Sequence, residues 1–259
     1  MRPLRAEILE VNYADGASVR RATEGADAVV HLAGALVAQP GETLLQANTE
    51  TTRAVAEAAA AGGAKLFVYL SFPGANPASK NDYLRTKGLA EEVIRANEFA
   101  GAIFRVPLIL GPENAPMQKL RQMARAPLVP LVSGGAVRIQ PIAQSDVLAA
   151  IEWALRARPG SPMRVMDLVG PETLSYAELL RRVGQRLGRR PRILPVPKAA
   201  GWLSALIAGS IVPSLGWNRS VFDVLFKEHL ADPNPARAAL PFAFATVNEI
   251  LDQATANSG

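Results

Sequence analysis

The sequence predicts an α/β fold built on a parallel sheet, and three observations carry this prediction. The run from Lys65 to Ser71 is rich in β-branched and aromatic residues, which is typical of a buried parallel strand. A loop with glycine and proline follows, and then a helical pattern with apolar residues on one side runs to about Asn97. The chain has 259 residues, 49% of them hydrophobic, enough for one α/β domain with a smaller C-terminal lobe.

Tyr83-Leu-Arg-Thr-Lys87, on this helix, is a candidate proton-transfer pair. Positions i and i+4 lie on one helix face, so the Lys87 ammonium can lie beside the Tyr83 phenol. A neighbouring positive charge lowers a phenol pKa of ~10 by roughly 1–3 units, toward the range of a general acid or base at neutral pH. Ser71 ends the preceding strand, and ligands bind at the carboxyl ends of strands in open α/β sheets.

A serine at a strand end, followed a dozen residues later by Tyr-x-x-x-Lys, resembles the active site of the short-chain dehydrogenase/reductase superfamily. Further segments resemble its extended and atypical members in the right order. They are the strand and loop at 26–34, the asparagine-bearing helix at 46–61, the strand with its Arg-x-Pro and Gly-Pro ending at 104–112, and the aspartate-bearing segment at 138–147. Residues 170–176 and 195–197 are similar to the branch that includes the nucleotide-binding accessory subunit of respiratory complex I.

The resemblance implies a Rossmann-like parallel sheet flanked by helices. An NAD(P)-binding domain is expected over residues 1–160, and a small, mostly helical lobe over 161–259 is expected to be interleaved with it. The family's N-terminal Gly-x-x-Gly-x-x-Gly turn, which holds the pyrophosphate at a helix N-terminus, does not occur in this sequence. Residues 6–11 resemble the family's third strand, so we expect an N-terminally truncated member without the first two strands. The alternative is a member that has lost dinucleotide binding.

The truncation leaves the strand near residues 28–33 as an apolar edge. Residues 6–11 could instead pair with it through a right-handed crossover, because Ser18 to Gly25 is compatible with a helix.

The resemblance also implies the roles of individual residues. Tyr83 would exchange a proton with the substrate, Lys87 would hold the nicotinamide ribose, and Ser71 would polarise the substrate carbonyl, although extended members place this hydroxyl nearer to Pro73. The cofactor would be NAD or NADP, and the positions expected beside it are Asn12, Ala33, Gly34, Asn48, Lys87 and Pro107. Asn12 stands where the family usually has an aspartate near the adenine.

Two classes of function follow. The first is an NAD(P)-dependent oxidoreductase or epimerase-like enzyme with a small-molecule substrate, such as a sugar nucleotide, an isoprenoid or a related lipid. The second is a non-catalytic, nucleotide-binding accessory or assembly protein with respiratory-complex subunits as partners, or a cofactor-free truncated form. The variable lobe after about residue 160 would select the substrate.

Charge and composition favour plain interpretations. The net charge is +5 and the sequence pI is 9.8, but the arginines between 181 and 192 alternate with leucines at helical spacing and are expected to form a solvated helix face. No nucleic-acid module is recognisable, the two histidines lack metal-site spacing, and there is no cysteine. We therefore predict a cytoplasmic protein that binds neither nucleic acid nor metal.

Residues 199–217 are uncharged and are interrupted by glycine, serine and proline. Two readings stay open here: a helix packed over the substrate cleft, or a helix that makes peripheral contact with the inner membrane. Four further side chains are given structural roles. His31 is expected in the core, His229 at the surface, Arg105 beside a carboxylate or a ligand, and Asp146 as the N-cap of a helix from Val147 to Arg156.

Overall fold

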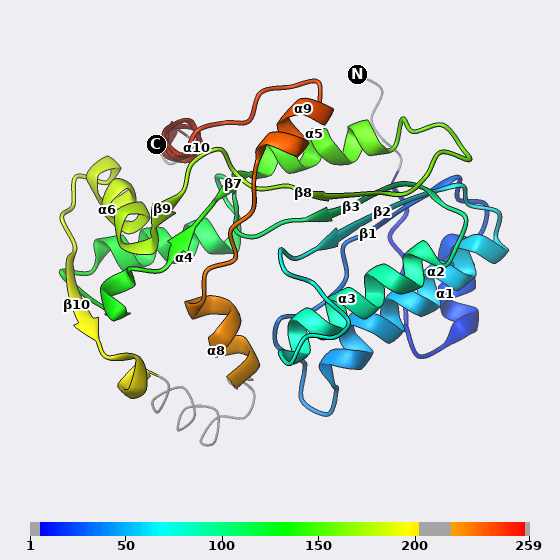
Figure 1. The fold of residues 1–259 in the computed structure, drawn as a ribbon, viewed down its shortest axis with the longest axis horizontal. Coiled ribbons are helices and arrows are strands. Elements are labelled where there is room, and N and C mark those ends of the chain that lie inside the picture. The colour runs from blue at the N-terminus through cyan, green and yellow to red at the C-terminus, as the bar shows by residue number, and fades with distance from the viewer. Residues whose placement is uncertain (1–5, 202–218, 257–259) are drawn as a thin grey trace.

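The computed structural model describes residues 6–201 and 219–256. Its centre is a four-stranded parallel sheet with the order β1-β2-β3-β8. The strands are β1 (Ala28–His31), β2 (Leu66–Ser71), β3 (Ala100–Arg105) and β8 (Arg164–Asp167). Helices lie on both faces of this sheet (Figure 1), so the expected Rossmann-like architecture is confirmed.

The two faces of the sheet carry separate cores because successive side chains of a strand point to opposite sides. Phe67, Tyr69 and Ile103 pack against α1 (Gly16–Thr23), α2 (Thr51–Ala61) and α3 (Asp82–Arg95). Val68, Ala102 and Phe104 pack against α5 (Gln144–Ala154) and α9 (Asn234–Ala239) on the other side. A strand buried on both faces explains the apolar run that predicted β2.

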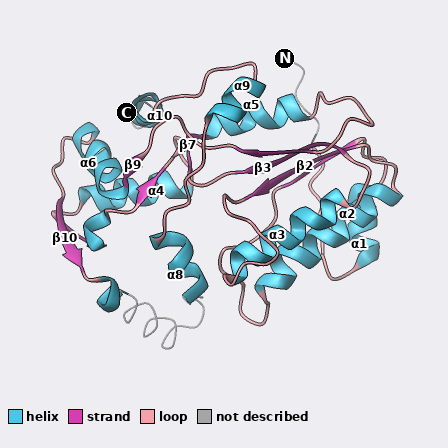
Figure 2. Cartoon of the chain, in the orientation of Figure 1, coloured by secondary structure: helices cyan, strands magenta, loops and turns pink. Residues whose placement is uncertain are grey.

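A second group of elements forms a lobe beside the sheet (Figure 1). Its helices are α4 (Ala115–Arg125), α6 (Tyr176–Arg186) and α10 (Val247–Ala256), which share one core. Its short strands pair as β5 (Leu128–Val132) with β10 (Arg192–Val196), β4 (Ile109–Leu110) with β7 (Ile142–Ala143), and β6 (Arg138–Ile139) with β9 (Leu174–Ser175). Figure 2 shows these strands among the helices. The lobe therefore draws on residues before and after 160, as an interleaved arrangement requires, while the boundary at 160 stays a prediction.

Residues 6–11 do not form the expected strand and do not pair with β1. Within the described ranges, β1 has β2 on one side and no strand on the other. The apolar side chains of the segment are largely uncovered, since Ile8 is 95% exposed and Leu9 46% exposed. It leads into α1, where the Asn12 amide donates to the Ser18 hydroxyl at 3.0 Å. The strand that the family resemblance implied for residues 6–11 is thus not formed, because a strand also needs a neighbour to satisfy its backbone groups.

The helix expected over 46–61 occurs as two consecutive parts. A π-helical segment, Leu45–Glu50, precedes α2 and contains Asn48. Short π-helical insertions are common at functional sites because they re-aim a side chain within a continuous helix.

The predicted solvated arginine face of α6 is only partly solvated. Arg182 pairs with Glu172 and Glu178, and Arg186 pairs with Asp252 of α10. These arginines therefore tie α6 to its neighbours.

Residues 202–218, which carry most of the predicted cleft-covering or membrane-contacting segment, lie outside the described residues. Of the helices that are described, none is both long and apolar enough to cross a bilayer.

Candidate active site

Tyr83 occupies the first turn of α3. The Asn81 side chain caps this helix by accepting a hydrogen bond from the Leu84 amide at 3.2 Å. The Tyr83 ring is 9% exposed and meets Phe72 edge-on, with 5.5 Å between ring centroids. Burial raises its pKa, opposite to the lowering expected from Lys87. The Tyr83 hydroxyl has no hydrogen-bond partner among the described residues.

Lys87 is buried one turn after Tyr83, and its ammonium is held at the carboxyl end of β2. Nζ donates to the Tyr69 hydroxyl at 3.1 Å and to the Leu70 carbonyl at 3.0 Å. It also lies 4.7 Å from the centroid of the Tyr69 ring. Burial lowers the pKa of Lys87 to about 8, against the opposing charge of Glu91. An ammonium has three N–H groups, so one is left to hold a ligand.

Asn48 and Gly34 complete the surroundings of Lys87. The Asn48 side chain accepts from the Ala35 amide and donates to the Ala35 carbonyl, both at 2.9 Å, and so fixes the loop after β1. Gly34 has φ 147°, and a Cβ at this position would lie 2.8 Å from Asn48 Oδ1 and 3.0 Å from Lys87 Nζ. The structure thus brings together three of the residues predicted from the sequence, and their close approach leaves no room for a side chain at Gly34.

A group of buried polar side chains packs next to Lys87. His31 is 4% exposed, and its Nε2 lies 3.1 Å from the Thr52 hydroxyl, while its ring stacks on Tyr69 in the neighbouring strand. Burial, together with the charge of Lys87, lowers the pKa of His31 to about 4. The expected core role of His31 is confirmed. The roles of Thr52 and Tyr69 were not foreseen, because neither belongs to a recognised spacing.

Ser71 belongs to a second network. Its hydroxyl donates to Glu91 Oε1 at 2.6 Å, and Arg105 donates to both Glu91 oxygens, at 2.9 and 2.7 Å. Glu91 is 1% exposed, so this is a buried carboxylate with three charge-assisted hydrogen bonds. Of the two roles open for Arg105, the structure shows the pairing with a carboxylate. Glu91 was missed, although it follows Lys87 by one more helical turn.

The remaining cofactor-side candidates are spread out. Asn12 is exposed, and its side chain accepts from the Ala14 amide to shape the turn before α1. Ala33 lies in the loop after β1. Pro107 lies two residues beyond β3, whose last residue, Arg105, is paired in register with Ser71. The roles of these three residues beside a cofactor stay predictions.

Two of the structural roles predicted from the sequence need correction. Asp146 is not an N-cap, because α5 already begins at Gln144, and the Asp146 carboxylate instead accepts from the Ala245 amide at 2.8 Å. The same helix ends at Ala154, two residues earlier than expected. His229 is not a surface residue, since its ring is half-buried against Phe72, at 5.1 Å between ring centroids.

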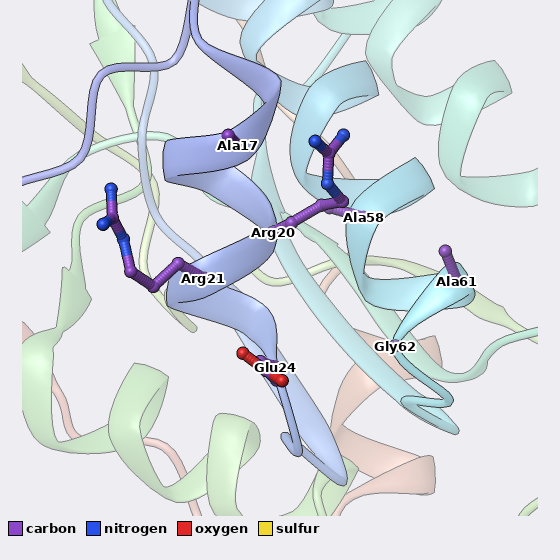
Figure 3. A pocket seen from close by; sticks show the side chains of 7 residues that line it. All are labelled: Ala17, Arg20, Arg21, Glu24, Ala58, Ala61 and Gly62. Atoms are coloured by element: carbon purple, nitrogen blue, oxygen red, sulfur yellow. The ribbon is translucent and has the colours of Figure 1, made fainter.

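Two hollows differ in their relation to this site. One, of about 450 Å³, lies between α1 and the end of α2, and Figure 3 shows that the Arg20 and Arg21 side chains point apart around it. It contains none of the candidate residues. The other, of about 440 Å³, borders the first turn of α3 and connects it with the loop after β1. It is lined by Ala38, Glu42, Thr43, Leu44, Leu45, Asp82, Arg85 and Thr86.

Comparisons with known proteins agree with this geometry. Residues 1–126 match the model of a family described as NAD(P)H-binding. The chain is 28% identical to a ceramide reductase of Caulobacter vibrioides over 82% of its own length, and 25% identical to the 40 kDa subunit of the NADH-ubiquinone oxidoreductase of Neurospora crassa over 87%. These matches agree with the resemblance to atypical members of the short-chain dehydrogenase/reductase superfamily. The chain spans 65% of that ceramide reductase and 59% of that subunit, less than two thirds of each.

Solved structures show the same fold. The triphenylmethane reductase of Citrobacter sp., complexed with NADP(H), matches with a TM-score of 0.72 at 16% identity, covering 96% of this chain and 84% of that chain. The enzyme WbmH of Bordetella bronchiseptica, in complex with NAD⁺, matches with a TM-score of 0.68 at 18% identity, covering 96% of this chain and 81% of that chain.

NAD or NADP is the cofactor of the family that residues 1–126 match. The residues of this chain fit the nicotinamide-ribose end, because Lys87 has an N–H group left over beside the loop at Gly34. For the pyrophosphate end, the sequence contains no glycine-rich turn of the family type.

Proposed function

We propose that this chain carries the catalytic residues of an NAD(P)-dependent reductase that converts a carbonyl to a hydroxyl on an amide-bearing lipid of the ceramide type. One observation carries the proposal: Tyr83, whose hydroxyl has no hydrogen-bond partner in the described part of the chain, lies in the first turn of α3, one turn before a fixed and buried Lys87. The ceramide reductase relative supports the lipid substrate.

The chemistry assigned to the chain's own groups is proton transfer and positioning. The bound nicotinamide supplies hydride to the carbonyl carbon. The Tyr83 O–H bond breaks as its proton moves to the carbonyl oxygen, so the product is an alcohol and the phenolate is left behind. The Lys87 ammonium, one helical turn away, holds the ribose hydroxyls and stabilises the phenolate. Asn48 acts indirectly, because it holds the loop at Gly34 and Ala35 against Lys87.

Burial of Tyr83 suits a proton donor better than a proton acceptor. A raised pKa keeps the phenol protonated at neutral pH, ready to donate in the direction of carbonyl reduction. Burial becomes unfavourable after the proton has been transferred, because a charged phenolate is then in a buried site. The neighbouring Lys87 ammonium is the group that offsets this electrostatic cost.

The test is a reductase assay with a defined probe. A ketone can arise only from the secondary hydroxyl of ceramide, so the probe is a short-chain ceramide oxidised at that position, supplied with NADH or NADPH. Turnover that falls at least a hundredfold in Tyr83→Phe, with cofactor binding kept, is the expected result. Full activity of Tyr83→Phe would contradict the assignment of the proton donor.

A second candidate is a non-catalytic, dinucleotide-binding accessory subunit of a respiratory complex at the inner membrane. One structural observation favours it. The Ser71 hydroxyl, expected to polarise the substrate carbonyl, is engaged by the buried Glu91. The relatives from Neurospora crassa and Arabidopsis thaliana are also respiratory-complex subunits by name. Cofactor binding without turnover of the ketone probe, together with co-purification with membrane-complex subunits, would select this candidate.

A further inference from the structure

His229 lies in the connection between α8 (Arg219–Phe226) and α9, close to the candidate proton donor. Its ring stands nearly perpendicular to Phe72, at 72° and 5.1 Å between centroids. Phe72 in turn stands at 71° and 5.5 Å to Tyr83. One aromatic ring therefore separates His229 from Tyr83, although the two residues are far apart in the sequence.

Hydrogen bonds fix the chain on both sides of His229. The Gln140 side chain makes two hydrogen bonds of 2.9 Å with the Ala231 backbone, one to its amide and one to its carbonyl. Asn81, the cap of α3, donates to the Ser220 carbonyl in α8, also at 2.9 Å. The same residue that sets the start of the Tyr83 helix thus anchors the helix that precedes His229, so the two side chains are positioned together.

One ring nitrogen of His229 is buried without a partner. The ring is hydrogen-bonded to the backbone of Asp223, whereas Nε2 is buried and makes no hydrogen bond within the described part of the chain. Burial lowers the pKa of His229, against the opposing hydrogen bond to Asp223, so the ring is neutral at pH 7. In a neutral imidazole whose other nitrogen donates, Nε2 is an acceptor. A buried polar atom left unpaired destabilises the folded protein, and a donor brought by a ligand would remove this cost.

We propose that His229 is a substrate-positioning residue whose Nε2 accepts a hydrogen bond from an N–H or O–H group close to the substrate's reacting carbonyl. This inference rests on the proposed reductase function and deepens it. It defines the substrate class as carbonyl compounds with a hydrogen-bond donor a few bonds away, as in a ceramide ketone, whose amide N–H is on the carbon next to the carbonyl. Ketones without that donor lose the contact.

Two variants separate the acceptor from the shape of the side chain. His229→Gln keeps a hydrogen-bonding amide at a similar reach, and His229→Phe keeps a ring without an acceptor. With the short-chain ceramide ketone as the probe, we expect His229→Phe to raise KM at least tenfold while kcat stays within about threefold. His229→Gln should stay within threefold of the unmodified protein. With an N-methylated and O-methylated form of the probe, the unmodified protein and His229→Phe should become equal. An unchanged KM in His229→Phe, or an equal loss with both probes, would overturn the inference.

A second readout does not need turnover. The chain has only two histidines, so ¹⁵N-histidine spectra of the folded protein contain one set of signals from His31 and one from His229. In the Tyr83→Phe variant with NADPH bound, the probe should shift the Nε2 signal of His229 and leave that of His31 in place. A shift without turnover in any variant would support the His229 contact and contradict the reductase. Turnover without a shift would do the reverse, and would show that Nε2 pairs with an ordered water only.

Discussion

The Lys87 ammonium donates a hydrogen bond to the Tyr69 hydroxyl, at 3.1 Å, and none to Tyr83 on its own helix. The ring of Tyr69 also lies 4.7 Å from Nζ. Since β2 positions Tyr69 and α3 positions Lys87, the contact joins a strand to a helix at the end of the sheet where a cofactor would bind.

The depressed pKa of Lys87 makes the stability of the protein depend on pH. The folded-state pKa is about 8 and the ordinary value is 10.5, so between these values the unfolded chain binds more protons than the folded chain. The free energy of unfolding of the unmodified protein, relative to Lys87→Met, should therefore rise as the pH rises from 8. The rise should reach roughly 1–2 kcal/mol by pH 9.5 and be absent below pH 8. Urea unfolding of both proteins from pH 7 to 9.5 measures this difference, and a flat difference would show that Lys87 is not desolvated.

His31 makes the free energy of unfolding depend on pH on the acidic side. Its folded-state pKa is about 4 and its ordinary value is 6.5, so the unfolded chain binds more protons as the pH falls through this window. The unmodified protein should lose up to roughly 3 kcal/mol relative to His31→Gln between pH 6.5 and pH 4. The imidazole itself should stay neutral down to about pH 4 in ¹⁵N-histidine spectra. Protonation of His31 near pH 6.5 in the folded state would contradict its burial against Thr52.

The buried carboxylate of Glu91 should be far more important for stability than an exposed one. Replacing Glu91 by Gln removes the negative charge and one of the two acceptor oxygens, so the buried Arg105 pair loses its counter-charge, and loss of one partner of a buried pair costs roughly 3–5 kcal/mol. The control is Glu57→Gln, which removes the exposed pair with Arg53 and should cost less than about 1 kcal/mol. Similar midpoints for the two variants in urea would mean that the Ser71–Glu91–Arg105 network adds little.

How far the sequence predicts this structure depends on how local each signal is. The β2 strand and the helix that carries Tyr83 and Lys87 follow from an apolar run and a helical pattern within about thirty residues, and both were predicted. The partner of Ser71 lies 20 residues away, and the partner of Lys87 lies 18 residues before it on another element. No sequence motif has a separation of 20 or 18 residues that would reveal these two contacts. Residues 6–11 were mispredicted for a related reason, because their pattern does not reveal whether a neighbouring strand is there.

Gly34 should not tolerate a side chain, and Gly41 should. Both have positive φ, of 147° and 85°, but a Cβ at Gly41 has open space, whereas one at Gly34 meets Asn48 and Lys87. Gly34→Ala should thus cost roughly 2–4 kcal/mol and weaken cofactor binding, whereas Gly41→Ala should cost about 1 kcal/mol from backbone strain alone. Thermal unfolding with and without NADPH compares the two. Equal losses would indicate that the loop after β1 does not approach Lys87 this closely.

The account rests on a dinucleotide site at Lys87, and a calorimetric titration of the chain with NADH and NADPH tests it most directly. Lys87→Met is the test variant, and Lys119→Met, at an exposed lysine of α4, is the control. We predict saturable binding that persists in the control and is lost in Lys87→Met. It should be accompanied by a stabilisation of about 2.7 kcal/mol at a hundredfold excess over Kd. Absence of binding by the folded, unmodified chain, or undiminished binding by Lys87→Met, would contradict the central claim.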